Sequence, residues 1–347
     1  MKNRLRIAAV LLLLAGVLAG CSGKNENTEA GMQALRDLDY DAAAICFDSA
    51  EEAGENARLI ARGRGILSMG RTDYEAAVDY FTAALQGSNG QLEPIDYDLN
   101  YYLAAAQTKL GDYVAAESCY DAILALDEQE DACFLRGNVR IASGRFEEAR
   151  QDYDRVIAMD PDNYGRIIEI YNELSAFGYR EAGLEYLQAV LDRGKDKLTD
   201  LEKGKIHYYM GDYSNAALSL EAARSVSADP ESYLYLGQSY EAMGEYNYAS
   251  NVYENFLSQV EGNAVIYNQL GLCYMKMGNY EGALTSFGEG MKLGDAAMAQ
   301  SLSFNEAVTY EYLGRYHEAA LLMENYLKTY PDDAVAQREY IFLETRE

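Results

Sequence analysis

The chain has 347 residues, with 29 basic and 56 acidic side chains, and its formal net charge is −27. A charge of this sign repels phosphate backbones and anionic headgroups, so it argues against nucleic acid as a ligand and against electrostatic membrane binding. Only four prolines in a composition that is 49% hydrophobic indicate a folded, helix-rich protein. Two explanations of the acidity stay open, a well-solvated exported surface and a preference for basic partners.

The first twenty residues are organised like an export signal. A basic start at residues 2–6 precedes an apolar run over residues 7–18, and this run is shorter than the roughly 20 residues that a membrane-spanning helix needs. It leads into Leu-Ala-Gly-Cys at residues 18–21. This ending resembles the lipobox of bacterial lipoproteins, whose cysteine becomes the first mature residue and carries a diacylglycerol. The resemblance implies that residues 1–20 are a signal peptide and that Cys21 is lipidated.

Two acyl chains anchor a protein stably to a membrane, and residues 21–29 read as the lipidated cysteine with a short polar tether. We therefore expect an exported protein anchored to the outer face of the cell membrane, or to the outer membrane in a bacterium that has two membranes. The alternative is an ordinary signal peptide cut nearby, which would leave Cys21 as a free thiol.

An aromatic residue recurs through the remaining chain in steps of 33 to 39 residues. The aromatic residues are Tyr40, Tyr74, Tyr113, Phe146, Tyr179, Tyr213, Tyr246, Tyr280 and Tyr316. Three residues after each stands an alanine, seven after stands a large side chain, and nine before stands a small residue in eight of nine cases. Glycine stands two residues before six of them. This pattern predicts two helices joined by a glycine-capped turn, with small residues where the helices approach most closely.

The pattern resembles the tetratricopeptide repeat, a helix–turn–helix of about 34 residues. The closest match is residues 264–297, with Tyr267, Leu270, Gly271, Tyr280 and Ala283 in the family's positions. The resemblance implies an all-α, right-handed superhelical solenoid of antiparallel helix hairpins over residues 24–333. Its nine units are expected at 24–57, 58–91, 97–130, 130–163, 163–196, 197–230, 230–263, 264–297 and 300–333.

Three places depart from a regular repeat. The 39-residue step predicts an inserted loop around residues 87–94, a candidate contact site. Unit 163–196 has Ile170 in place of the small residue and no glycine two residues before Tyr179, so we expect a local change of helix angle there. Residues 333–347 are expected to form a helix that caps the last apolar face.

Motifs for catalysis, metals or cofactors are not found in the sequence. His207 and His317 lie in different units without metal-like spacing, and no two cysteines have C-x-x-C spacing. Residues 160–171 begin like a calcium loop but end on tyrosine where such a loop needs glutamate. We therefore expect no enzyme activity, no metal and no cofactor. Whether Cys119 and Cys133 pair or are buried apolar residues stays open.

In the tetratricopeptide family the first helix of each hairpin lines a concave groove that takes a peptide. By that resemblance, the groove-facing residues are Tyr101, Phe134, Asn138, Ile167, Tyr171, Lys205, Tyr208, Leu234, Gln238, Glu241, Asn268 and Phe304. Aromatic side chains with interspersed amides suit peptide recognition. The same aromatic residues are also what a core between hairpins needs.

These patterns favour an envelope lipoprotein that binds protein or peptide partners and acts as an interaction scaffold or assembly adaptor. The alternative is an extracytoplasmic protein that captures peptides or glycans for uptake or sensing.

Overall fold

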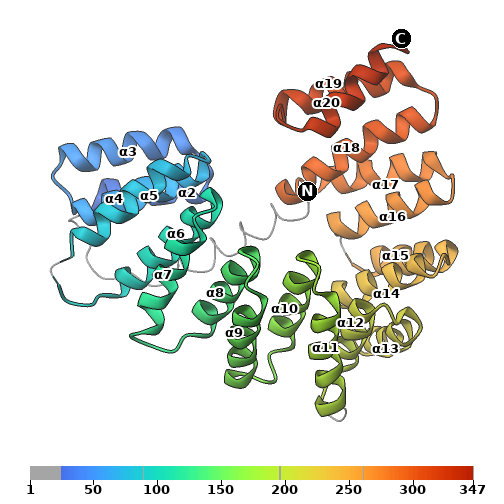
Figure 1. Cartoon of the computed structure of the whole chain (residues 1–347). Helices are drawn as coiled ribbons and strands as arrows, with labels where there is room; N and C mark the ends of the chain where they lie inside the picture. Colours follow the sequence, from blue (N-terminus) through green and yellow to red (C-terminus); the bar gives the residue numbers. More distant parts are fainter. Residues whose placement is uncertain (1–24, 89, 195–196, 261, 347) are drawn as a thin grey trace. The chain divides into compact units, whose positions relative to one another are not determined.

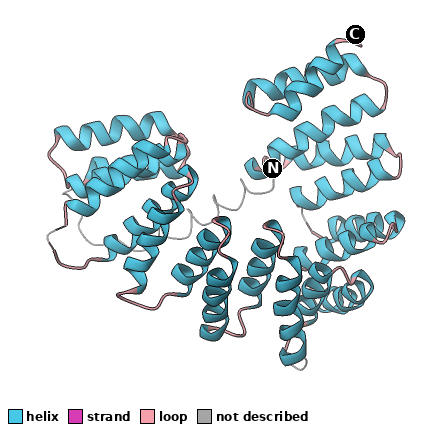
Figure 2. Cartoon of the chain, viewed as in Figure 1, coloured by secondary structure: helices cyan, strands magenta, loops and turns pink. Residues whose placement is uncertain are grey.

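The computed structural model describes residues 25–88, 90–194, 197–260 and 262–346, so the expected signal peptide and Cys21 lie outside the described residues. All regular secondary structure in these ranges is α-helical, and the ranges contain no strand (Figures 1 and 2). The predicted all-α class of repeated helix hairpins is therefore confirmed. No helix within the described ranges combines the length and the apolar character that crossing a membrane requires.

The chain divides into two compact units. In unit 1, which ends at Asn163, the hairpins are α2 (Glu26–Arg36) with α3 (Tyr40–Glu52), α4 (Ala57–Gly70) with α5 (Tyr74–Gln86), α6 (Pro94–Leu110) with α7 (Tyr113–Leu124), and α8 (Glu130–Ala142) with α9 (Phe146–Met159).

In unit 2, which begins at Tyr164, they are α10 (Tyr164–Ala176) with α11 (Arg180–Gly194), α12 (Asp200–Met210) with α13 (Tyr213–Val226), α14 (Pro230–Ala242) with α15 (Tyr246–Gln259), α16 (Ala264–Lys276) with α17 (Tyr280–Lys292), α18 (Ala296–Tyr312) with α19 (Tyr316–Thr329), and last the single helix α20 (Ala334–Glu344).

One expectation about irregular segments needs correction. The tether expected over residues 21–29 is wrong from Glu26 onward, because α2 begins there and buries Thr28 and Gly31. The connection expected around residues 87–94 is present, because α5 ends at Gln86 and α6 begins at Pro94. Helix α6 has 17 residues, so an additional helical turn also contributes to the long step.

The repeated turns depend on a left-handed backbone conformation. Glycine adopts it two residues before the second helix in most hairpins, for example Gly111 with φ 80° and Gly244 with φ 80°. The first two hairpins have no glycine in this place, and Leu38 and Thr72 take it with φ 59° and 62°. For a β-branched residue such as Thr72 this conformation is strained. The geometry of the turn is thus kept even where the sequence lacks the residue that adopts it most easily.

Small residues let each second helix lie close to the first. A Cβ placed on Gly31, Gly65, Gly137, Gly204, Gly237 or Gly271 would lie 2.2–2.7 Å from the large side chain seven residues into the paired second helix. These side chains are Phe47, Phe81, Tyr153, Leu220, Tyr253 and Phe287, and all are fully buried. Each ring or branched side chain therefore packs directly on helix backbone.

The fifth hairpin reverses this contact: its glycine, Gly183, lies on the second helix, where a Cβ would lie 2.9 Å from the ring of Tyr171 on the first. The packed residues of the second helix stand one residue later than the sequence indicated. Its buried small residue is Gly183 and its buried large residue is Leu187, whereas Ala182 and Tyr186 are only half-buried. The turn glycine is Gly178, with φ 88°, two residues before Arg180. The turn is therefore capped by glycine although none stands two residues before Tyr179, because this aromatic residue stands one residue ahead of the true register.

Helix α20 covers the last hairpin only in part. Ala336 and Leu343 are buried among side chains of α19. Ile341, however, is 61% exposed, and Phe342 is exposed as well. The expected helix thus exists, and it covers the last apolar face with Ala336 and Leu343 while Ile341 and Phe342 stay exposed.

A pair of carboxyl groups makes the packing of α20 sensitive to pH. Burial and a hydrogen bond with Glu339 raise the pKa of Glu311 to about 7, and Arg346 opposes the shift. The folded chain therefore holds a proton here at a pH where the unfolded chain has lost it, so this contribution to stability is present in acid and disappears as the pH rises through about 7.

We expect Glu339→Gln to stabilise α20 by on the order of 1 kcal/mol at about pH 8, and to change little at about pH 5. Hydrogen exchange of the α20 amides at both pH values measures this, with Glu344→Gln, an exposed carboxyl on the same helix, as the control. Equal protection of α20 in the wild type and the Glu339→Gln variant at both pH values would contradict the expectation.

Candidate functional surface

The twelve residues expected to face a groove divide by burial. Phe134, Ile167, Tyr171 and Asn268 are buried in the structure. The other eight, Tyr101, Asn138, Lys205, Tyr208, Leu234, Gln238, Glu241 and Phe304, are half-buried. Only half-buried side chains present surface to a partner without rearrangement, so the four buried residues are corrected to core positions.

The register of the fifth hairpin explains two of these corrections. Ile167 is 1% exposed, and the ring of Tyr171 lies beside Gly183 of the paired helix. Moving the repeat by one residue places both on the side of α10 that faces α11. The polar Asn172 then takes the half-buried place that was expected for Tyr171.

In unit 1, the half-buried residues of the first helices are largely occupied by internal contacts. The hydroxyl of Tyr101 donates to Gln129 at 2.9 Å, and the side-chain oxygen of Asn138 accepts from the hydroxyl of Tyr153 at 2.9 Å. These contacts hold neighbouring helices together, so Tyr101 and Asn138 have an evident structural role.

Arginine–carboxylate pairs join neighbouring hairpins of unit 1. Arg58 and Arg62 on α4 pair with Asp96 and Asp98 on α6. They link the first helices of two successive hairpins. The repeat pattern gave no signal for them, because the positions of charged side chains vary from one unit to the next.

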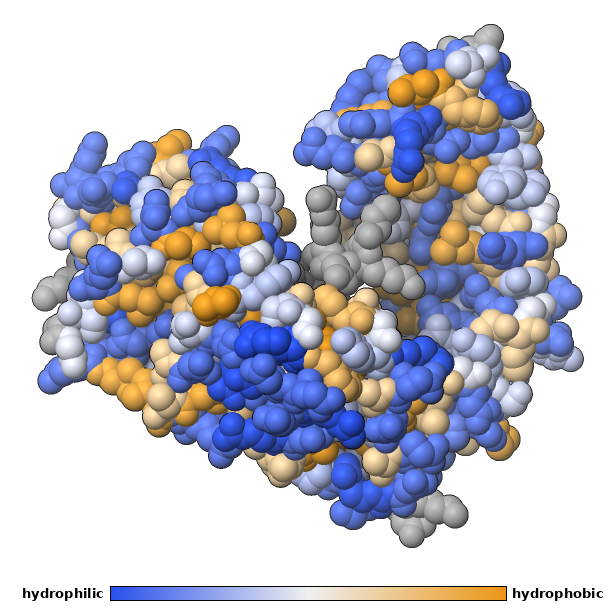
Figure 3. All heavy atoms as spheres, viewed as in Figure 1, coloured by the Kyte–Doolittle hydropathy of each residue, from blue (hydrophilic) through white to orange (hydrophobic). Residues whose placement is uncertain are grey.

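A larger ionic network lies among α7, α8 and α9. Arg136 and Arg140 both bind Asp152, which is 1% exposed, at 2.6 and 2.9 Å. The hydrogen bonds that Arg136 donates to Asp152 and Asp121 raise the pKa of its guanidinium above the ordinary value. The carboxylate of Glu117 forms ion pairs with the guanidinium groups of Arg140 and Arg145, at N–O distances of 2.7 and 2.5 Å. Hydrophilic side chains gather over α8 and α9 in Figure 3. Because the arginines and carboxylates of this network pair with one another, its role is to hold α7, α8 and α9 together.

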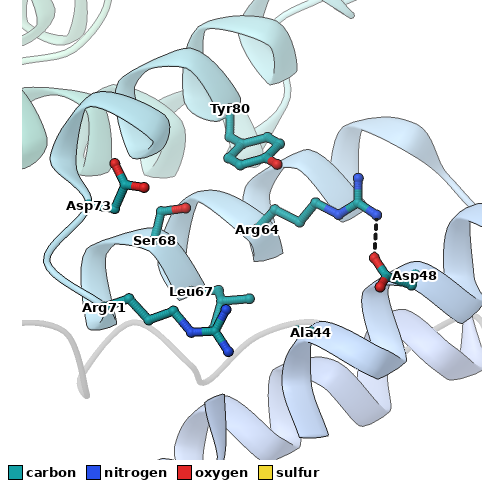
Figure 4. A pocket seen from close by; sticks show the side chains of 8 residues that line it. All are labelled: Ala44, Asp48, Arg64, Leu67, Ser68, Arg71, Asp73 and Tyr80. Atoms are coloured by element: carbon teal, nitrogen blue, oxygen red, sulfur yellow. Dashed lines mark hydrogen bonds and ion pairs between the residues drawn. The ribbon is translucent and has the colours of Figure 1, made fainter. Parts of the chain in front are cut away.

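A hollow of about 490 Å³ opens between α3, α4 and α5 (Figure 4). Its lining residues are Ala44, Asp48, Arg64, Leu67, Ser68, Arg71, Asp73 and Tyr80. Arg64 already binds Asp48 at 2.9 Å, and Arg71 binds Asp41 at 2.7 Å. The two arginines of the hollow are therefore already paired, and the residues expected in the groove do not line it.

In unit 2, tyrosines from four helices form one packed cluster. The rings of Tyr208 and Tyr235 lie 5.1 Å apart, and the hydroxyls of Tyr209 and Tyr235 lie 2.9 Å apart. Tyr171 and Tyr213 extend the cluster on either side. Burial raises the pKa of Tyr208 to about 12. The sequence indicated Tyr171 and Tyr208 for this region but missed Tyr209 and Tyr235, which lie one residue off the positions that the repeat marks.

Three adjacent first helices of unit 2 carry half-buried stripes. The spacing of each stripe is three or four residues, which places its members on one helix face. The stripes are Leu201, Lys205 and Tyr208 on α12; Leu234, Gln238 and Glu241 on α14; and Leu272 and Met275 on α16. Helix α14 contacts both α12 and α16. We call these residues the first-helix surface of unit 2.

The two charged residues of this surface differ in their surroundings. The ammonium of Lys205 binds Glu231 at 3.0 Å and lies 5.4 Å from the ring of Tyr235. Glu241 accepts one hydrogen bond, from the hydroxyl of Tyr253 at 2.6 Å. Burial raises the pKa of Glu241, while the Tyr253 bond and the charge of Lys276 oppose the shift.

Cysteines and histidines do not form a chemical centre in the described part of the chain. Cys46, Cys119, Cys133 and Cys273 are free, so Cys119 and Cys133 are not bonded to each other in this structure. Burial raises the pKa of Cys119 to about 11, which keeps its thiol protonated and unreactive. Among the described residues, no group of three histidine, cysteine or acidic side chains could hold a metal ion.

Models of known protein families match several segments of this chain. Models described as "Tetratricopeptide repeat" match residues 69–131, 130–163 and 292–333. A model of "Anaphase-promoting complex, cyclosome, subunit 3" matches residues 210–290. The matched ranges lie in both units.

Similarity to individual proteins is more distant. The chain is 28% identical over 117 residues to human RNA polymerase II-associated protein 3 and 27% identical to the mouse protein, and it spans only 16% of the length of either. A tetratricopeptide repeat protein from Parabacteroides merdae is similar at 16% identity with a TM-score of 0.45, over 73% of this chain and 98% of the other. Human IFIT1, solved as a dimer with PPP-AAAA, is similar at 14% identity with a TM-score of 0.49, over 92% and 80%.

Proposed function

Since the chain carries tetratricopeptide repeats, we propose that it is an envelope lipoprotein that binds protein segments on its first helices. In this role it acts as a scaffold or assembly adaptor that holds a partner near a bacterial membrane.

The first-helix surface of unit 2 is the observation that carries the proposed binding function. It combines half-buried apolar side chains with an amide and charged groups across three adjacent helices. Apolar area supplies affinity for a peptide, and the polar groups fix its register. Packing from the second helices holds these side chains in place, so binding costs little conformational entropy.

The proposed anchoring depends on the N-terminal sequence. A basic start, a short apolar run and Leu-Ala-Gly-Cys at residues 18–21 support lipidation of Cys21. Helix α2 begins at Glu26, so about four residues, reaching roughly 14 Å at most when extended, would separate the lipid from the first hairpin. A partner held by the repeats would therefore stay close to the membrane.

We expect Cys21→Ser to release the protein from the membrane fraction, because the thiol that would carry the lipid is lost. Fractionation of the producing cells, with the mass of the N-terminal peptide, measures this. Cys46→Ser, which changes a cysteine within α3, serves as the control and should stay with the membrane. A Cys21→Ser protein that remains in the membrane fraction would refute the anchor.

A photocrosslinking residue at position 238 should capture a protein partner in living cells, and the same residue at position 218 should not. Gln238 lies on the proposed binding surface, whereas Leu218 is 71% exposed on the second helix α13. Adding Leu234→Ser should reduce capture at position 238 several-fold, because it removes neighbouring apolar contact area. Identical products from positions 238 and 218 would count against the proposed surface.

A further inference from the structure

A carboxylate on the first-helix surface of unit 2 is held in a partly desolvated position. Tyr253 of α15 packs with its ring on the backbone of α14 at Gly237, and its hydroxyl donates to Glu241 at 2.6 Å. The absence of a side chain at Gly237 lets the ring lie there, so the packing of the hairpin also positions the carboxylate.

Among the described residues, the negative charge of Glu241 has no ion-pair partner. A carboxylate can accept about four hydrogen bonds, and the described residues supply one, from Tyr253. Lys276 acts on Glu241 electrostatically, but among the described residues no basic group forms an ion pair with it. Lys205, by contrast, is already bound to Glu231. The charge left over on this surface is therefore negative.

Two tyrosines, Tyr208 and Tyr253, lie near this carboxylate. Tyr208 on α12 is close enough to Glu241 to interact with it electrostatically. Leu234 and Gln238 precede Glu241 on the same face of α14. A half-buried carboxylate beside an aromatic ring favours an ammonium or guanidinium group, since the ion pair and the attraction of the cation to the ring add together.

We propose that the first-helix surface of unit 2 binds a basic peptide segment and that Glu241 receives a lysine or arginine side chain of this partner. The inference rests on the proposed function and deepens it by naming the chemistry of the partner. The net charge of −27 would draw such a segment toward the protein.

The geometry also limits the length of the segment. Packed helices lie roughly 8–10 Å apart, so crossing α12, α14 and α16 takes about 20 Å. An extended peptide rises about 3.3 Å per residue, so roughly six to eight residues cover the surface.

Display of random peptides of roughly eight residues tests the inference. The wild-type protein, Glu241→Gln and Glu245→Gln are each used to select binders at physiological salt. Glutamine at position 241 keeps an oxygen that can accept the Tyr253 hydrogen bond and removes only the charge. Glu245→Gln removes the same charge from an exposed position in the turn after α14, and thermal unfolding checks that all three proteins fold alike.

The wild type and Glu245→Gln should enrich lysine or arginine at one peptide position, and binders of this kind should lose about fivefold in affinity for Glu241→Gln. Binders that lack this enrichment, or that bind Glu241→Gln equally well, would overturn the basic-partner inference and leave the proposed function standing. Suppose that the crosslinking residue at position 238 captures no partner in cells, and that neither the wild type nor either variant selects a peptide. Both the basic-partner inference and the proposed function are then refuted.

Discussion

The structure depends on one close contact that recurs in six of its hairpins, in which a large side chain of the second helix lies against a glycine of the first. At Gly65 and Gly271, for example, a Cβ would lie 2.4 Å from the opposing ring. Dispersion contacts and burial of these side chains hold together two helices that would be marginal alone. The spacing of small and large residues in these hairpins follows from this contact.

The same contact determines what the first helices can present. Once the second helix occupies one face and the neighbouring hairpins occupy two more, only a narrow stripe of each first helix remains half-buried. In the seventh hairpin the contact reaches this stripe directly, since the ring of Tyr253 lies on Gly237 and its hydroxyl meets Glu241. Core packing and surface chemistry are linked there through a single tyrosine.

The periodicity of the sequence was sufficient to predict the helix hairpins, because small and large residues recur at fixed spacing. It misplaced the fifth hairpin by one residue, since Tyr179 stands where the aromatic residue was expected although Gly183 and Leu187 are the residues that pack. That shift also sent Ile167 and Tyr171 to the wrong side of their helix. Position within a repeat thus defines a helix face, and an error of one residue exchanges surface for core.

The contacts between hairpins could not be predicted from the sequence. The pairs of Arg62 with Asp98, and of Arg136 with Asp121, join residues that no repeat position specifies. The role of Glu241 was also hidden, because its partly desolvated state depends on Tyr253 in another helix. Charged side chains acquire their roles from neighbours that only the folded chain brings together.

The most direct test of this account is the free energy of unfolding in urea of Gly237→Ala compared with Gly288→Ala. A Cβ at Gly237 would lie 2.2 Å from the buried ring of Tyr253, whereas one at Gly288 would meet nothing within 4 Å. We expect Gly237→Ala to destabilise unit 2 by roughly 1–3 kcal/mol, and Gly288→Ala to stabilise it by up to about 1 kcal/mol. An equal gain in stability from both substitutions would contradict the central role of the close contact.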